Sequence, residues 1–154
     1  MQRCPVVRFA AVRKGTATRA RRAPVTVHLP PRSWPRRPDA VPGTRVDLLV
    51  HERVHGADLY GGIIQIAPGR TVPLHWHRRG ELQFVLSGVG FLLHPDGRET
   101  AVRARSAVFS PAGRTGAHGF RATGRAPLAI LFLYGSPRGK RPWLARLKHQ
   151  PWTS

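Results

Sequence analysis

Short apolar runs alternate with glycine, proline and aspartate turns between residues 46 and 136. The runs expected to form strands are residues 46–54, 62–67, 72–77, 81–86, 89–93, 99–102, 107–110, 119–121 and 128–134. Pro68-Gly69 and Pro95-Asp96-Gly97 separate neighbouring runs, and Asp-Gly is a strong hairpin signal. Many short strands at regular spacing indicate a sandwich or barrel. We therefore predict an all-β fold, a double-sheet jelly-roll barrel that limits exposed edges.

The run at residues 81–86 is apolar on one face and mixed on the other, because alternate strand residues share a face. One face carries Glu81, Gln83 and Val85, and the other carries Leu82, Phe84 and Leu86. Apolar residues on both faces imply cover on both sides. We expect a homodimer through the Leu82 face, with the chain's own tail around Trp143 as the alternative cover.

The two ends of the chain lack this strand pattern. Residues 1–44 are rich in proline and arginine, and their apolar residues follow no helical or strand period. Such a segment buries too little apolar surface to repay its ordering entropy. We predict a disordered basic extension at residues 1–44, a barrel at 45–136 and a tail at 137–154 with the spacing for one short helix near Trp143.

Candidate chemistry concentrates in the stretch GRTVPLHWHRRGELQFVLSG, residues 69–88. His75 and His77 would project side by side from one strand face. Glu81 follows the short turn at residues 78–80 and can face them from the next strand. Two imidazoles and a carboxylate converging on a point suit a first-row transition metal. His118 is a plausible fourth ligand.

This stretch resembles the first motif of the cupin superfamily, through Gly69, His75, His77, Glu81 and Gly88. The second motif of that family matches at Pro111-Ala112-Gly113. It departs at Arg105, where the family has glycine, and at Ala122, where it has asparagine. The gap from Gly113 to His118 is two residues longer than usual, and we expect the extra residues, including Gly116, to bulge outward. The resemblance covers residues 46–136.

The resemblance implies a small antiparallel barrel that holds one divalent metal through His75, His77, Glu81 and His118. Imidazole and carboxylate ligands suit Fe(II), Mn, Ni, Cu or Zn, and Fe(II) is the metal we favour. Four protein ligands leave two positions of an octahedral metal open for a bidentate substrate or dioxygen. Tyr134 and Gln83 are the candidate catalytic residues beyond the ligands. We expect Phe91, Phe109, Phe120 and Phe132 to line the interior.

Metal-binding cupins include dioxygenases, isomerases, lyases and cyclases. We predict a dioxygenase-type oxidoreductase acting on a small organic substrate, with a metal-dependent isomerase or lyase as minor alternatives. The alternative of another class is a non-catalytic cupin that binds or senses a small ligand. The sequence has no helix-turn-helix pattern of the kind fused to sensors, which favours the enzyme.

A competing motif is HERVH, residues 51–55, which spells the zinc-protease pattern H-E-x-x-H. That chemistry requires a helix, so that both histidines share one face. The apolar run at residues 48–50, the β-branched Val54 and the following Gly56 favour a strand instead. We interpret His51 and His55 as neighbours on one strand face rather than as protease ligands.

The formal net charge of +19 raises the question of nucleic-acid binding. Residues 1–45 carry eleven basic side chains and one acid, and residues 46–154 carry fifteen and six. Only three of the basic residues are lysines, and Arg, Ala, Pro and Gly are all encoded by GC-rich codons. No interleaved aromatic pattern offers a stacking platform. Phosphate contacts would be compatible with the charge, but we do not expect nucleic acid to be the partner.

The expected cellular compartment follows from the cysteine count and from the apolar runs of the sequence. A single cysteine, Cys4, rules out a disulfide framework and a cysteine-rich zinc site. No apolar run approaches the roughly 20 residues that span a bilayer, and arginines interrupt the apolar patch near the N-terminus. We therefore expect a cytoplasmic protein whose partners are small molecules and a second copy of itself, with no membrane.

Overall fold

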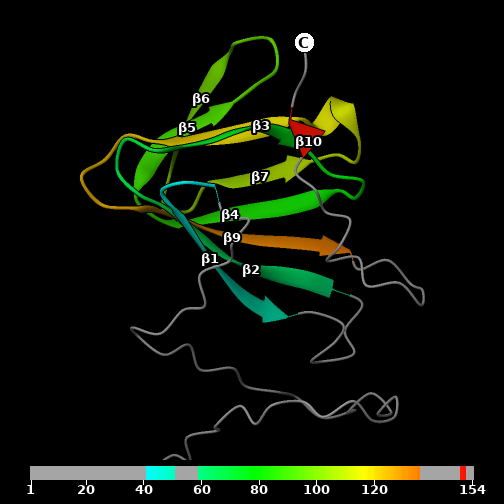
Figure 1. Cartoon of the computed structure of the whole chain (residues 1–154), viewed down its shortest axis with the longest axis horizontal. Helices are drawn as coiled ribbons and strands as arrows, with labels where there is room; N and C mark the ends of the chain where they lie inside the picture. The colour runs from blue at the N-terminus through cyan, green and yellow to red at the C-terminus, as the bar shows by residue number, and fades with distance from the viewer. Residues whose placement is uncertain (1–40, 51–58, 136–149, 152–154) are drawn as a thin grey trace, which may run out of the picture.

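The structure, a computed structural model, describes residues 41–50, 59–135 and 150–151, which form two antiparallel sheets (Figure 1). The strands are β1 (Thr44–Val50), β2 (Leu59–Ile66), β3 (Thr71–Trp76), β4 (Glu81–Ser87), β5 (Val89–Leu93), β6 (Glu99–Arg103), β7 (Ala107–Ser110), β8 (His118–Ala122), β9 (Leu128–Gly135) and β10 (Gln150–Pro151). A single 3₁₀ turn, η1 (Arg114–Gly116), precedes β8. No helix in these described segments is long and apolar enough to cross a membrane.

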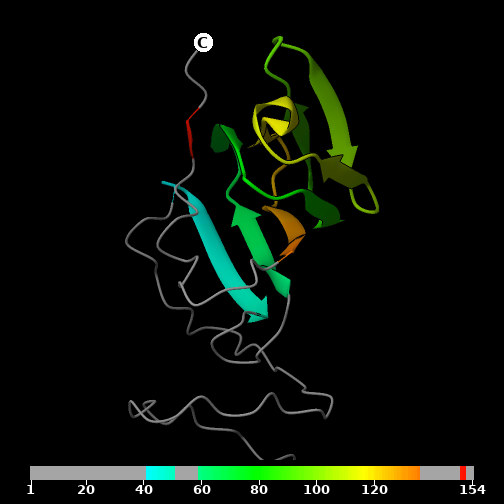
Figure 2. The same ribbon diagram turned by 90° about the vertical axis from the view of Figure 1, so that its right-hand side faces the viewer.

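The chain passes repeatedly from one sheet to the other, as Figures 1 and 2 show. One sheet has the strand order β1-β2-β9-β4-β7, and the other has the order β10-β3-β8-β5-β6. All recorded strand pairs are antiparallel. This arrangement is the double-stranded β-helix, or jelly roll, so the all-β prediction is confirmed.

The hydrophobic core lies between the two sheets and draws on both of them. Ile66, Leu128, Ile130 and Val85 are its largest fully buried side chains, all from the first sheet. Val72, Leu92 and Phe120 meet them from the second sheet. Each buried side chain of this size contributes about 1.5–3 kcal/mol of transfer free energy. The core therefore holds the two sheets against each other and fixes the positions of the strand ends.

The observed strands follow the predicted ones closely. β5 and β7 have the predicted bounds, and β9 exceeds its predicted run only by Gly135. β2 begins three residues earlier than predicted, at Leu59, and β1 begins at Thr44, just before the predicted barrel boundary. The short β10, which pairs with β3, was not predicted because two residues show no period. Residues 1–40, the HERVH segment and the tail near Trp143 lie outside the described residues.

Two glycines of the first motif occupy backbone conformations that other residues adopt at a cost. Gly69 and Gly88 have φ values of 71° and 84°, in the left-handed region that glycine enters freely. A Cβ at Gly88 would also collide with the carbonyl oxygen of Pro127. Glycine is therefore required at the turn between β4 and β5 for both conformational and steric reasons.

Arg105 has the same kind of backbone conformation without being glycine. Its φ is 75°, the only positive value of a non-glycine residue in the described segments. It lies in the β6–β7 turn, where the Ser106 amide donates to the Arg103 carbonyl at 2.9 Å. The Arg105 amide itself donates to the Val85 carbonyl at 2.9 Å. A hydrogen bond to β4 therefore holds Arg105 in the left-handed conformation, at the position where the second cupin motif has glycine.

We expect Arg105→Gly to stabilise the protein. A left-handed conformation costs a residue with a Cβ about 1–2 kcal/mol, and the unfolded freedom of glycine offsets about 0.5–1 kcal/mol of the gain. The free energy of unfolding should rise by about 0.5–1 kcal/mol, measured by urea denaturation. Arg125→Gly, at an exposed loop residue without positive φ, is the matched control. A destabilised Arg105→Gly protein would contradict the prediction.

Candidate metal centre

Four polar side chains of the predicted site meet at one end of the barrel. His75 lies in β3, His77 directly follows that strand, and Glu81 opens β4. His118 opens β8, where the β3–β8 register pairs it with His75. The side chains are 4–6 % exposed, so all four are buried. The pairing of distant strands has thus brought the sequence-predicted ligands together.

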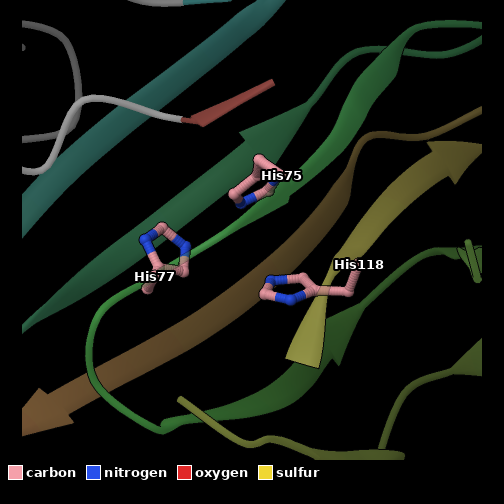
Figure 3. A group of neighbouring side chains, drawn as sticks. All are labelled: His75, His77 and His118. Atoms are coloured by element: carbon pink, nitrogen blue, oxygen red, sulfur yellow. The ribbon is translucent and has the colours of Figure 1, made fainter. Parts of the chain in front are cut away.

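The three histidines form a tight group (Figure 3). Their candidate ligand nitrogens all lie within 4.8 Å of one another. The ring centroids form a triangle, in which His75 is 4.8 Å from His77 and 4.6 Å from His118, and His77 is 5.7 Å from His118. Three imidazole donors at this separation could hold a metal ion.

Hydrogen bonds to backbone carbonyls set the tautomers of two of these rings. Nδ1 of His75 lies 2.8 Å from the Pro73 carbonyl oxygen, and Nδ1 of His118 lies 2.8 Å from that of Gly116. Because a carbonyl oxygen only accepts, each Nδ1 carries the proton. The lone pair of each neutral ring is then on Nε2. Metal-binding histidines are oriented in this way, by donating the other ring N–H to a neighbouring acceptor.

Glu81 completes the cluster with a carboxylate. Its Oε2 lies 3.3 Å from Nε2 of His77 and 3.1 Å from Nε2 of His118. Lone pairs would face one another across these distances unless protons or a cation lay among them. A buried carboxylate with three imidazoles is also a donor set that first-row divalent metals prefer. The residues present therefore fit a divalent transition metal.

Tyr134, near the end of β9, places a hydroxyl beside the ligands. Its oxygen lies 3.3 Å from Nε2 of His77, and the two rings are 4.8 Å apart at an edge-on angle. Burial and the nearby charge of Glu81 raise the pKa of Tyr134 well above its ordinary value. Tyrosine is protonated at neutral pH at its ordinary pKa, and both effects oppose its ionisation further, so the hydroxyl can donate a hydrogen bond.

Gln83 links the cluster to the neighbouring strand. It is 2 % exposed, and its Nε2 lies 2.7 Å from Nε2 of His118. The Ser110 hydroxyl at the end of β7 donates to Gln83 Oε1 at 3.3 Å. The inward direction of both Gln83 and Glu81 agrees with the predicted alternation along β4.

The loop before His118 differs from the expected outward bulge. Arg114 and Thr115 are exposed, but Gly116 is buried in η1, where a Cβ would collide with the Pro111 carbonyl oxygen. The Gly113 amide donates to the His77 carbonyl at 2.7 Å. The longer loop therefore turns inward and ties His118 to the strand end that carries His77, so the outward path expected for Gly116 was wrong.

Two further expectations about the interior were wrong. Phe109 is 69 % exposed on the outer face of its sheet, because its position in β7 pairs with the outward Leu82. Phe91 lies 5.4 Å from the Arg121 guanidinium, on the other side of β5 from buried Leu92. Phe120 and Phe132 are buried, as expected.

Sequence reasoning missed two residues that belong to this end of the barrel. Ser110 was not singled out, although it directly precedes Pro111 of the second motif. Tyr60, in β2, packs its ring 5.9 Å from Tyr134 and pairs with it across the sheet. Only the β2–β9 register reveals that contact, since residue 60 lies before the first motif.

Comparisons with known proteins agree with this architecture. A family model described as a cupin domain matches residues 62–134. The polyketide cyclase RemF from Streptomyces resistomycificus is 27 % identical, with a TM-score of 0.56, and the match covers 64 % of this chain and 69 % of that one. A search of curated proteins gives no match.

More distant solved structures share the fold. KdgF from Halomonas sp. is 19 % identical with a TM-score of 0.53, over 65 % of this chain and 86 % of that one. A predicted oxalate decarboxylase from Thermotoga maritima is 22 % identical with a TM-score of 0.53, over 61 % and 81 % of the two chains. At these identities the likeness concerns the fold alone.

We expect His75→Ala, His77→Ala, Glu81→Ala and His118→Ala each to weaken divalent-metal binding by about tenfold or more. The barrel should stay folded, because the substitutions leave the largest fully buried side chains, Ile66, Leu128, Ile130 and Val85, in place. Metal content of the purified proteins and titration with Zn²⁺ would measure the effect. His94→Ala, which removes a half-buried histidine that is bonded to Thr100 and lies outside the cluster, is the matched control. Full metal retention in His77→Ala would refute the assignment.

Proposed function

The chain belongs to the cupin superfamily, and from this membership and the buried histidine cluster we propose a metal-dependent enzyme that closes a ring in a small, carbonyl-rich molecule. The observation that carries the proposal is the buried Tyr134 hydroxyl, 3.3 Å from Nε2 of His77. An acid group that keeps its proton next to a Lewis-acid site suits carbonyl chemistry.

His75, His77, His118 and Glu81 are the residues that would hold the metal. When bound, a divalent metal would act as a Lewis acid that polarises a substrate carbonyl oxygen. Burial of the site excludes most water, which strengthens electrostatic interactions there. Fe(II) is the metal we favour, and Zn, Ni, Mn and Cu are also compatible with these donors.

Tyr134 would then assist the same carbonyl. Its ring packs against those of Tyr60 and Phe132, at centroid distances of 5.9 Å and 5.5 Å, so the position of its hydroxyl oxygen is fixed. A fixed donor aimed at developing negative charge stabilises a transition state. The phenol would donate a hydrogen bond to the carbonyl oxygen as that oxygen gains charge.

The cyclase class is favoured by RemF, whose 27 % identity exceeds that of the other structures named above. An intramolecular aldol closure balances without any redox partner. A carbon adjacent to one carbonyl loses a proton and bonds to a second carbonyl carbon. The oxygen of the second carbonyl takes up the proton and becomes a hydroxyl. This hydroxyl then leaves as water with a hydrogen from the neighbouring carbon, which gives the unsaturated ring.

A dioxygenase is the second candidate. It is supported by the donor set, since three imidazoles and one carboxylate suit Fe(II) and other redox-active metals. The two candidates differ in their stoichiometry. A dioxygenase consumes one O₂ per turnover and adds its oxygen atoms to the substrate, whereas the cyclase consumes none and releases water.

We expect metal-loaded protein to convert an aromatic poly-β-ketone to a product lighter by water, without oxygen consumption. Mass spectrometry and an oxygen electrode would follow the reaction, and ¹⁸O₂ would label any oxygenated product. Oxygen uptake with label incorporation would replace the cyclase with the dioxygenase. Tight substrate binding without turnover by any metal form would favour the non-catalytic ligand-binding cupin.

We expect Tyr134→Phe to lower kcat by about a hundredfold while leaving metal content unchanged. The substitution removes only the hydroxyl, so ring packing against Tyr60 is kept. Tyr60→Phe, which removes a hydroxyl from the adjoining ring, is the matched control. An unchanged kcat in Tyr134→Phe would remove the phenol from the mechanism.

We also propose that the partners are a small molecule and a second copy of the chain. The outer face of the β1–β2–β9–β4–β7 sheet exposes Leu59, Leu82, Phe84, Leu86 and Phe109 by 39–69 %. The register places Leu82 between Phe109 and Leu133, so the residues form a continuous apolar patch. Such patches are typical of protein interfaces. Cytoplasmic location and the absence of a nucleic-acid partner stay predictions of the sequence.

We expect a dimeric mass by light scattering at micromolar concentration. Phe84→Lys should shift the protein toward the monomer, because the charge would be buried in the apolar contact. Val89→Lys is the matched control, since Val89 is 46 % exposed but belongs to the other sheet. A monomeric wild-type protein would leave the C-terminal tail as the expected cover.

A further inference from the structure

Gln83 occupies an unusual place for a neutral side chain. It follows Glu81 on the inner face of β4 and is buried. Its amide nitrogen lies 2.7 Å from Nε2 of His118, the atom that also faces the Glu81 carboxylate at 3.1 Å. The amide therefore contacts a candidate metal ligand at its ligating atom, rather than at the back of its ring.

This contact competes with metal binding. Because Nδ1 of His118 donates to the Gly116 carbonyl, the lone pair of the neutral ring is on Nε2. An amide N–H from Gln83 would use that lone pair, and so would a metal. A metal bound at Nε2 would also face the positive end of the amide dipole. Metal binding thus disfavours this orientation of the amide.

In the opposite orientation the amide loses its hydrogen bond to His118 but keeps one with Ser110. A half-turn of the amide exchanges its nitrogen and oxygen, two atoms that only the hydrogen-bond network distinguishes. In the present orientation the Ser110 hydroxyl donates to Oε1. After the half-turn the same hydroxyl accepts from the amide N–H, because a hydroxyl can donate or accept. Oε1 then faces the histidine cluster.

We propose that Gln83 supplies a fifth protein donor, its amide oxygen, to the metal, with Ser110 holding the amide in that orientation. The inference rests on the proposed metal site and deepens it. Five protein donors leave one open position in a six-coordinate metal. One open position accommodates a substrate carbonyl, whereas dioxygen and substrate together need two. Gln83 therefore favours Lewis-acid chemistry over dioxygenation.

The test compares Gln83→Leu with Gln83→Glu. Leucine removes the oxygen at similar size, and we expect Zn²⁺ affinity measured by calorimetry to fall about tenfold or more. Glutamate keeps an oxygen at the same place, so Gln83→Glu should retain at least the wild-type affinity. Gln65→Leu, on the half-buried outer face of β2, is the matched control for the substitution itself.

Cobalt substitution gives a second readout that does not depend on turnover. The visible absorption of Co²⁺ strengthens as its coordination number falls, so Gln83→Leu should absorb more strongly than wild type. Ser110→Ala should show a smaller change in the same direction, and it decides the matter if Gln83→Leu fails to fold. Unchanged affinity and unchanged spectra in the folded variants would overturn the inference. A wild-type protein that binds neither Zn²⁺ nor Co²⁺ would instead overturn the proposed function.

Discussion

The burial of a carboxylate against two of the three clustered imidazoles is the constraint on which this end of the barrel depends. Glu81 faces His77 and His118 within 3.3 Å and is nearly inaccessible to water. A charge in such a place is costly unless it is paired or coordinates a metal. Protons or a cation must therefore balance the cluster, and the donor types favour a divalent cation. Hydrogen bonds from His75 to the Pro73 carbonyl and from His118 to the Gly116 carbonyl fix the two rings in orientations that suit a bound cation.

The burial of the site also explains why the loop before His118 is hydrogen-bonded to the segments that carry the ligands. Gly116 turns inward, and its carbonyl accepts a hydrogen bond from His118. The Gly113 amide donates to the His77 carbonyl. The loop thus reaches both ligands through backbone groups rather than through its own side chains. The two extra residues before His118 are absorbed in a 3₁₀ turn, whose exposed Arg114 and Thr115 leave the inner contacts intact.

Within a few ångströms, the site holds one side chain that keeps its proton and others that can bind a cation. Tyr134 keeps its proton because burial and the Glu81 charge both oppose ionisation. Glu81, by contrast, has imidazole nitrogens as its close neighbours. Gln83 adds a neutral dipole whose direction Ser110 can set either way. The site therefore combines a hydrogen-bond donor with oxygen and nitrogen donors, the groups on which the proposed carbonyl chemistry relies.

The sequence by itself determined the strands, the inner face of β4 and three of the proposed ligands, because these follow from local periods and from a motif within residues 69–88. It also indicated His118, through the second motif. Only the tertiary structure decided that Gln83 meets His118, 35 positions away, and that Tyr134 meets His77, 57 positions away. The same is true of the inward path of Gly116 and the outward path of Phe109. These contacts depend on which strands pair and in what register, and no local period encodes a pairing between distant strands.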